Sequence, residues 1–475
     1  MMSQYLLALS GLLLIGLPGF LVLVAFDHRK RLGILERLAL AYGLGLGLLT
    51  WQMLFLHFLG LPFGLYSILV PLLVGATAVL LGTSLWPRPQ HFSSATVKAG
   101  PSESLSQVER LLCAGIVLEL ATVFPKTLLL PMESYDAVTI WALKAKAFYL
   151  FRSIPTDFLL DHEYVTSHAD YPLLIPFAES YVYFFVGQFN DFLAKWLFPV
   201  SLTVLVAAFY ALLRRVGLSR PLQIAFCFML ASIPHFTHNA TTGYADILVA
   251  HFYGVAFCYL LLWFRDPQLI LLQVSALFSG LAGLTKNEGL VLAASNLIVM
   301  LFWAATDTPA RSLRGRLRYP LAYAAIVLVV LAPWLAFRVG IEVSNDVINQ
   351  KNILEAMHWN TLSRIPAILY HYQGHIFGFK NWNLLWVLAF GLLAVRFRSL
   401  WRSDLRYVVL AVALPLLVYT GTYLVTPYHE APFDVLWHLR TSASRLLIHV
   451  VPVVVFGLAC YCLGSGQKPP PLASE

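Results

Sequence analysis

The chain has 475 residues, of which 59% are hydrophobic and only 12% are charged, and its formal net charge is +8. A water-soluble domain carries about 25% charged residues, so this composition excludes a string of soluble domains and indicates one integral membrane domain. The basic residues stand in short clusters beside apolar segments, as in loops that flank membrane helices, so nucleic acid is not an expected partner.

Long apolar segments along the chain predict an all-α polytopic membrane protein with about thirteen transmembrane helices. Several segments have only about 16 residues, which is short for a hydrocarbon core about 30 Å thick, so those helices should pack against neighbours. The predicted spans are 4–26, 34–59, 62–86, 109–131, 192–213, 220–237, 245–264, 268–284, 288–304, 319–339, 383–397, 405–425 and 444–463.

The spacing of the spans divides the chain into three parts. The part at 1–108 holds three helices and ends in a polar linker rich in proline and serine. The part at 109–304 begins with a long polar segment at 132–191, which we name the first long loop. The part at 305–475 contains the second long loop, at 340–382.

Clusters of lysine and arginine set the expected orientation, because such clusters stay on the cytoplasmic side of a membrane. Thirteen spans with an outer N-terminus place all the clusters in the cytoplasm and both long loops outside. The apolar stretch 171–187 is therefore predicted as a helix lying in the outer interface, since a further crossing would move the basic cluster 214–220 to the outside. The clusters are 27–31, 214–220, 311–318 and 396–406. The expected location is a bacterial inner membrane, with the site facing the periplasm or exterior.

The first long loop opens with the sequence "PMESYDAVTIWALKAKAFYLFR", in which 136–152 is predicted as an interfacial helix. Its apolar face carries Trp141, and Lys144 is expected to extend its amine towards lipid headgroups. Asp136 begins this helix, where negative charge is favoured. Asp136 either caps the helix or acts as a general base at the membrane surface, and the two roles are compatible.

The same loop contains "DHEYVTSHADYP", whose side chains offer possible metal ligands. The spacing of these residues matches no compact metal motif, so a solvated loop is the favoured interpretation and a divalent metal the less favoured one. The candidate ligands are His162, Glu163, His168 and Asp170.

Two further spans meet the outer side with charged residues at their ends. Asp246 stands at the start of an apolar helix, where an acid either caps the helix or faces a polar cavity. Lys286 and Glu288 lie in the short sequence "TKNEG" between two apolar segments. They form either an ordinary polar turn or a turn whose lysine donates to a phosphate.

The last span is predicted to open with Arg445, in "WHLRTSASRLLIHVVP". An arginine there either extends to the surface or binds a phosphate through two parallel hydrogen bonds. His438 lies seven residues earlier and shares the face of Arg445 if the helix extends back that far.

Acids and bases thus gather at one predicted membrane surface. This arrangement suits a reaction on a lipid-linked phosphate, because a carboxylate can activate an acceptor hydroxyl while cations hold the departing phosphate. The sequence has neither a Walker pattern nor a dinucleotide-binding fingerprint.

Four stretches in this order resemble the GT-C superfamily of polyprenyl-phosphate-sugar-dependent glycosyltransferases. The resemblance extends over about 109–463 and is nearest to dolichyl-phosphate-mannose-protein mannosyltransferase-like and aminoarabinose-transferase-like membrane enzymes. The stretches are "ESYDAVTIWALKAKAFY", "HADYPLLIPF", "GLTKNEGL" and "WHLRTSASRLLIHVVP".

The resemblance implies a GT-C-type helical bundle that transfers a sugar, with inversion, from a polyprenyl phosphate to an acceptor glycan, lipid or protein. It implies that Asp136 and Asp246 are catalytic and that Lys286 and Arg445 bind the donor phosphate. Many members of the superfamily carry two adjacent acids in the first loop, whereas here Ala137 follows Asp136, so a metal-free mechanism without a cofactor is favoured. The implied supporting residues are His168, Asp170, Tyr171, Glu288 and His438.

Two other classes of function compete with glycosyl transfer. A lipid or solute transporter, or a flippase, predicts inverted repeats and ionisable residues near the middle of the bilayer, whereas these acids lie at predicted helix ends. A structural or assembly protein would leave the gathered acids and bases without a role.

Overall fold

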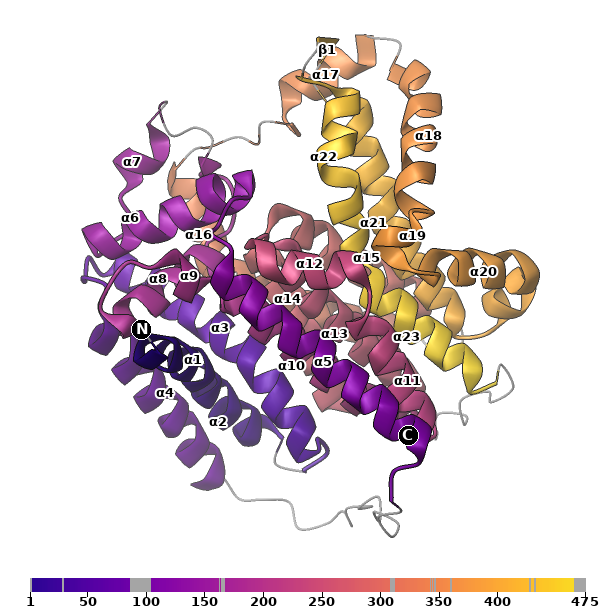
Figure 1. Cartoon of the computed structure of the whole chain (residues 1–475), viewed down its shortest axis with the longest axis horizontal. Helices are drawn as coiled ribbons and strands as arrows, with labels where there is room; N and C mark the ends of the chain where they lie inside the picture. Colours follow the sequence, from indigo (N-terminus) through magenta and orange to yellow (C-terminus); the bar gives the residue numbers. More distant parts are fainter. Residues whose placement is uncertain are drawn as a thin grey trace.

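In the residues that it describes, the computed structural model is all-helical except for one antiparallel pair of two-residue strands, β1 (His429–Glu430) and β2 (Phe433–Asp434) (Figure 1). The structure describes residues 2–27, 30–85, 104–161, 163, 167–307, 312–341, 343, 345, 347–358, 361–426, 429–430 and 433–464.

The N-terminal half of the chain contains the helices of 1–108 and those of the first long loop. The first part forms α1 (Met2–Leu14), α2 (Gly16–Phe26), α3 (Ile34–Phe58) and α4 (Leu65–Leu85). The first long loop lies between α5 (Gln107–Leu129) and α10 (Leu197–Val216). It forms the π-helix η1 (Ala137–Ala142), α6 (Leu143–Phe151), α7 (Thr156–Leu160), α8 (Leu174–Val186) and α9 (Asp191–Ala194).

The remaining helices build the centre and the C-terminal part. The central helices are α11 (Arg220–Ala231), α12 (Pro234–Thr242), α13 (Asp246–Arg265), α14 (Leu269–Thr285) and α15 (Asn287–Thr306). The C-terminal part contains α16 (Leu313–Ile341), α17 (Gln350–His358), the 3₁₀-helix η3 (Thr361–Arg364), α18 (Ile365–Ile376), α19 (Phe379–Trp382), α20 (Leu385–Arg402), α21 (Leu405–Val425), α22 (Val435–Ile448) and α23 (Val451–Cys462).

The protein is an integral membrane protein. Nine helices in the described chain are long and apolar enough to cross a membrane, and ten if the bent pair α22–α23 forms one span. The predicted count of thirteen is not reached, because in three predicted spans the helix is not long and apolar enough to cross a membrane. These helices are α11 (in 220–237), α14 (in 268–284) and α20 (in 383–397).

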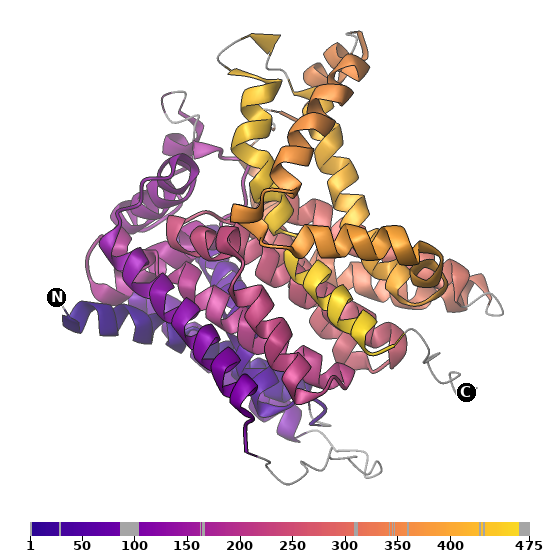
Figure 2. The same cartoon turned by 45° about the vertical axis from the view of Figure 1, so that its right-hand side comes forward.

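Each of these three helices has a local reason for the difference. α11 has 12 residues and is about 18 Å long, because the chain leaves helical geometry at Ser232 and Pro234 starts a new helix. α14 has 17 residues and ends at the turn before α15. α20 is interrupted at Arg396, continues into an arginine-rich end, and runs at a steep angle to α18 and α22 in both views (Figures 1 and 2).

α13 forms the centre of the bundle. Its first eighteen residues, Asp246 to Trp263, are all buried, and it packs against α10, α14, α15, α22 and α23. A helix of this length is about 30 Å long, close to the thickness of a hydrocarbon core. Its two ends therefore lie near opposite faces of the membrane.

The basic clusters gather around the C-terminal end of α13. Arg215 forms two hydrogen bonds with Glu36, at 2.8 Å each, and Tyr259 of α13 bonds the same carboxylate at 2.7 Å. Arg265, the last residue of α13, pairs with Asp404 at the start of α21. The predicted clusters 214–220 and 396–406 therefore lie at the end of α13 that is remote from Asp246.

The first long loop folds back onto the bundle. Trp141 and Phe148 are fully buried on η1 and α6, and α8 packs against α6, α3 and α1. The prediction that Lys144 reaches lipid headgroups is wrong. The side chain of Lys144 is buried, and its amine donates to the backbone oxygen of His168 at 3.0 Å, so it ties the helix to the rest of the loop.

Candidate active site

Asp246 is the centre of a buried charged cluster. It is the first residue of α13, and its side chain is 0% exposed. The carboxylate makes no capping bond but accepts hydrogen bonds from three side chains. Lys286 Nζ reaches Oδ1 at 3.0 Å, Arg445 Nε reaches Oδ2 at 2.9 Å, and His449 Nε2 lies 2.9 Å from Oδ1. A buried carboxylate needs such partners, and three of them saturate it.

The turn between α14 and α15 places Lys286 in the cluster. Lys286 is the one extended residue between the two helices, and its amine also pairs with Glu288 Oε1 at 2.9 Å. A Cβ atom at Gly289 would lie 1.8 Å from the backbone oxygen of Ala282, so only glycine permits this close turn. Burial opposes the charge of Lys286, but Asp246 and Glu288 outweigh that effect and raise the pKa of its amine.

Arg445 joins the two acids that the sequence singled out. Its Nη2 atom lies 2.6 Å from Asp136 Oδ2, while its Nε bonds Asp246. The guanidinium lies 3.8 Å from the centre of the Tyr244 ring, in a cation–π contact. Arg445 does not open the last helix as predicted. It lies in α22, one turn before the break that separates α22 from α23.

Asp136 differs from Asp246 in exposure and in bonding. Its side chain is 26% exposed, and it makes no side-chain capping bond, so the capping role considered for it is not found. It directly precedes the π-helix η1, a helix type that is common at functional sites. Asp136 is thus a partly exposed carboxylate of the cluster, whereas Asp246 is fully buried and pairs with both Lys286 and Arg445.

The position of Ala137 explains why a second acid is absent there. Ala137 is fully buried, and its Cβ lies 3.1 Å from the place where a side chain at Gly243 would begin. Gly243 itself has φ +86° and closes the turn between α12 and α13 that leads to Asp246. A carboxylate at position 137 would therefore displace this turn.

His449 and Tyr419 complete the cluster, and neither was predicted from the sequence. His449 is 0% exposed and lies at the break between α22 and α23, which bend by 43° there. Its Nδ1 atom lies 3.0 Å from the hydroxyl of Tyr419 on α21. An ionisable residue inside an apolar segment is itself a functional signal, and His449 carries that signal within "RLLIHVVP".

Asp170 forms a second, neighbouring cluster. Its Oδ2 atom accepts from Asn287 at 2.7 Å and from Asn345 at 2.8 Å, and its backbone oxygen accepts from Arg338 at 2.7 Å. Asp170 therefore joins the first long loop to the Lys286 turn and to the second long loop. Its asparagine partners could not be expected from the sequence alone.

Other predicted residues surround these two clusters. His168 has φ +51°, and its Nδ1 lies 3.9 Å from Asp170 Oδ1. Tyr171 packs edge-on against Trp141. His438 lies on α22, which does extend back past it, and bonds Thr426 Oγ1 at 2.8 Å.

Lys144 holds the backbone that leads to Asp170. Burial lowers the pKa of its amine to about 7, and the negative charge of Asp170 partly offsets this effect. The bond from Lys144 to His168 holds the backbone just before Asp170.

No three His, Cys, Asp or Glu side chains converge as metal ligands within the part of the chain that the structure describes. His162, one of the candidate ligands, lies outside the described residues. Asp170, another candidate, is bonded to two asparagine amides that donate to it.

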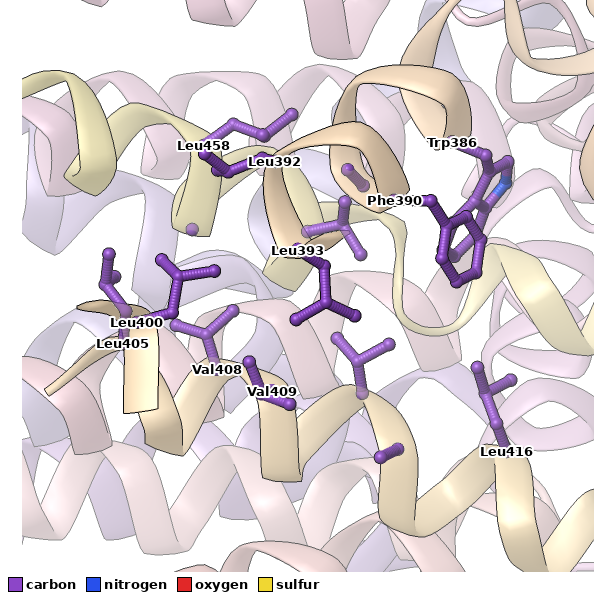
Figure 3. Close-up of a pocket in the computed structure, with 15 residues that line it drawn as sticks. Trp386, Phe390, Leu392, Leu393, Leu400, Leu405, Val408, Val409, Leu416 and Leu458 are labelled. Atoms are coloured by element: carbon purple, nitrogen blue, oxygen red, sulfur yellow. The ribbon is translucent and has the colours of Figure 1, made fainter. Parts of the chain in front are cut away.

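An apolar groove lies between α20, α21 and α23 (Figure 3). Its volume is about 810 Å³, which includes space open to the surroundings, and residues such as Leu393, Val408 and Leu458 line it. On α21 the lining ends at Leu416, one turn before Tyr419. On α23 the lining begins at Val454, five residues after His449. Both walls of the groove thus end near His449, which bonds Asp246, and Tyr419, which bonds His449.

Comparisons of the chain with protein-family models, with curated proteins and with solved structures found no match.

Proposed function

We propose that the protein transfers a sugar from a polyprenyl-phosphate donor to an acceptor hydroxyl on the non-cytoplasmic face of the membrane. The GT-C-type resemblance of the sequence motifs supports this proposal, and so does the clustering of four residues to which that resemblance assigns a role. Asp136, Asp246, Lys286 and Arg445 come from four separate segments and meet through direct ion pairs.

The observation that carries the proposal is the sharing of Arg445 between two carboxylates. Asp246 holds Arg445 and Lys286 side by side without using all of their donors, since arginine has five N–H groups and lysine three. A phosphate is the anion that such a pair binds well. It would take the Nη groups of Arg445 that Asp136 occupies, and so release Asp136.

Released Asp136 then acts as the general base. It accepts the proton of the acceptor hydroxyl, whose oxygen attacks the anomeric carbon of the donor sugar from the side opposite the phosphate. The bond between that carbon and the phosphate oxygen breaks, and its electron pair stays on the phosphate. Arg445 and Lys286 stabilise the new charge, so the product is polyprenyl phosphate plus an inverted glycoside.

Two features support a lipid-linked donor and an outward-facing site. The apolar groove of Figure 3 offers a path for a prenyl chain towards the cluster. The basic clusters lie at the remote end of α13, and the positive-inside rule places that end in the cytoplasm. We therefore propose a bacterial inner-membrane enzyme whose acceptor is a glycan, a lipid or a protein.

A transporter remains the competing function. The break between α22 and α23 beside the charged cluster is a feature that transporters share. Asp246, however, is the first residue of α13 rather than a mid-helix residue, which favours surface chemistry over transport through the bilayer.

Donor binding tests the proposal directly. In nanodiscs, Lys286→Ala and Arg445→Ala should each weaken binding of a polyprenyl-phosphate sugar by tenfold or more, about 1.5 kcal/mol for each lost charge-assisted bond. Arg440→Ala is the matched control, because Arg440 is an exposed arginine of the same helix. Unchanged affinity in both site variants would contradict the proposal.

A further inference from the structure

Among the described residues, the charged cluster holds three carboxylates but only one lysine and one arginine. Asp136, Asp246 and Glu288 face Lys286 and Arg445, so the cluster carries one net negative charge while His449 is neutral. Protonation of His449 would balance it. His449 is fully buried and bonds Asp246, so solvent does not screen the effect of its charge on the cluster.

The contacts of His449 suit both of its charge states. An ionised carboxylate only accepts hydrogen bonds, so Nε2 carries a proton towards Asp246 in either state. Nδ1 faces the hydroxyl of Tyr419, which can donate to a neutral ring or accept from a protonated one. A carboxylate at position 419 would fix the charged form, and an apolar residue would fix the neutral form.

We propose that His449 is a positioning residue that takes up a proton when the donor phosphate binds. This inference rests on the proposed function, because the incoming group is the donor phosphodiester. That group adds one negative charge to a cluster that already has one in excess, and a nearby negative charge favours the protonated imidazole. The leaving phosphate gains a further negative charge as the glycosidic bond breaks. The positive charge of protonated His449 stabilises that negative charge as well, so proton uptake also favours the reaction.

The other charged and titratable groups around His449 in the described residues are carboxylates, a lysine, an arginine and a tyrosine, and these group types ordinarily change charge outside pH 5 to 8. They are Asp246 on α13, Glu288 and Lys286 on the Lys286 turn, Tyr419 on α21 and Arg445 on α22, with Asp136 beyond Arg445. Two more histidines interact with the cluster, His235 with Asp246 and Arg445 and His438 with Glu288 and Lys286, and burial lowers the pKa of His235 to about 4. Imidazole is the side chain that ordinarily changes charge between pH 5 and 8.

Proton uptake and donor binding are linked, so donor affinity must depend on pH. The dissociation constant of the donor should be constant at low pH. It should rise by up to tenfold for each pH unit between the pH at which the imidazole loses its proton in the free protein and the higher pH at which it does so in the complex, and then become constant again. The probe should be a phosphodiester such as farnesyl-phosphate glucose, since a phosphomonoester has its own ionisation near pH 6.

The experiment measures binding of farnesyl-phosphate glucose to the full-length protein in nanodiscs between pH 5.5 and 8.5. We expect the rise for the wild type and a flat profile for His449→Gln, whose amide keeps a donor but cannot take up a proton. Tyr419→Phe should shift the rise to lower pH by about one unit, because the charged ring loses its acceptor. If His449→Gln does not fold, Tyr419→Phe decides the question.

Two matched controls separate His449 from other titrating groups. His438→Gln removes a histidine from the same helix, and Lys144→Met removes the buried amine whose pKa is about 7. Both variants should keep the wild-type rise. A flat wild-type profile, or a rise that persists in His449→Gln, would overturn the role of His449 while leaving the proposed function standing. No binding of the probe at any pH would overturn both.

Discussion

The ion pair between Asp136 and Arg445 makes an unusual prediction: removing the proposed base should strengthen donor binding. In the absence of substrate, Asp136 occupies the Nη2 group of Arg445 at 2.6 Å, and a phosphate must displace it. Asp136→Asn keeps the shape of the side chain but removes the competing negative charge. The donor should therefore bind more tightly to this variant than to the wild type.

The size of the effect follows from the exposure of the pair. Asp136 is 26% exposed and Arg445 12% exposed, so the pair lies between a solvent-screened surface pair, worth at most about 1 kcal/mol, and a buried charge-assisted bond, worth about 1.5–3 kcal/mol. About 1.5 kcal/mol corresponds to roughly tenfold tighter binding. The donor phosphate also meets one negative charge fewer, which acts in the same direction.

The assay is equilibrium binding of the radiolabelled donor to purified protein in nanodiscs. Glu133→Gln is the matched control, because Glu133 is an exposed acid three residues away, and its affinity should equal that of the wild type. Equal or weaker binding to Asp136→Asn would refute the idea that phosphate and Asp136 compete for Arg445.

Three other changes test the supporting structure. Gly289→Ala should destabilise the protein by about 3 kcal/mol, because the new Cβ would lie 1.8 Å from the oxygen of Ala282, whereas Gly391→Ala, with open space around it in α20, should not lower the thermal midpoint. Asp170→Ala should weaken donor binding by about fivefold, near 1 kcal/mol, because Asn287 beside Lys286 loses its acceptor; an unchanged affinity would mean that the Asp170 cluster does not position the turn. Burial lowers the pKa of Lys144 to about 7, so below pH 7 the folded protein holds a buried ammonium, and between pH 7 and about 10 the unfolded chain binds the extra proton. The stability of the wild type relative to Lys144→Met should therefore rise with pH above 7, and a constant difference in thermal midpoint would contradict the assignment.

The sequence predicted the members of the charged cluster better than their roles. Asp246, Lys286 and Arg445 stood out because charge at the end of an apolar helix is costly without a partner. Their partners could not be read from the sequence, since Asp246 and Arg445 lie 199 positions apart. That Asp246 is saturated and Asp136 partly exposed depends on how α13, α22 and η1 pack together. His449 was overlooked because a single histidine in an apolar segment gives no periodic pattern.

The helical architecture was predictable where the apolar segments are long, and less so where the chain breaks. All thirteen predicted spans contain helices, but periodicity alone did not reveal the new helix that starts at Pro234 or the bend at Arg396. Lys144 illustrates a different limit. Its position on an amphipathic helix suggested an exposed amine, yet the backbone oxygen of His168 supplies an acceptor that local sequence does not show.

The most direct test of the central claim is glycosyl transfer from the radiolabelled donor in membranes that contain the native acceptors. The measured quantities are polyprenyl phosphate released and label joined to acceptor. We predict both products with the wild type and with Glu133→Gln, and a loss of at least a hundredfold with Asp136→Asn, in line with the usual contribution of a general base. Equal product formation by the wild type and Asp136→Asn, or no product from the wild type, would contradict the account.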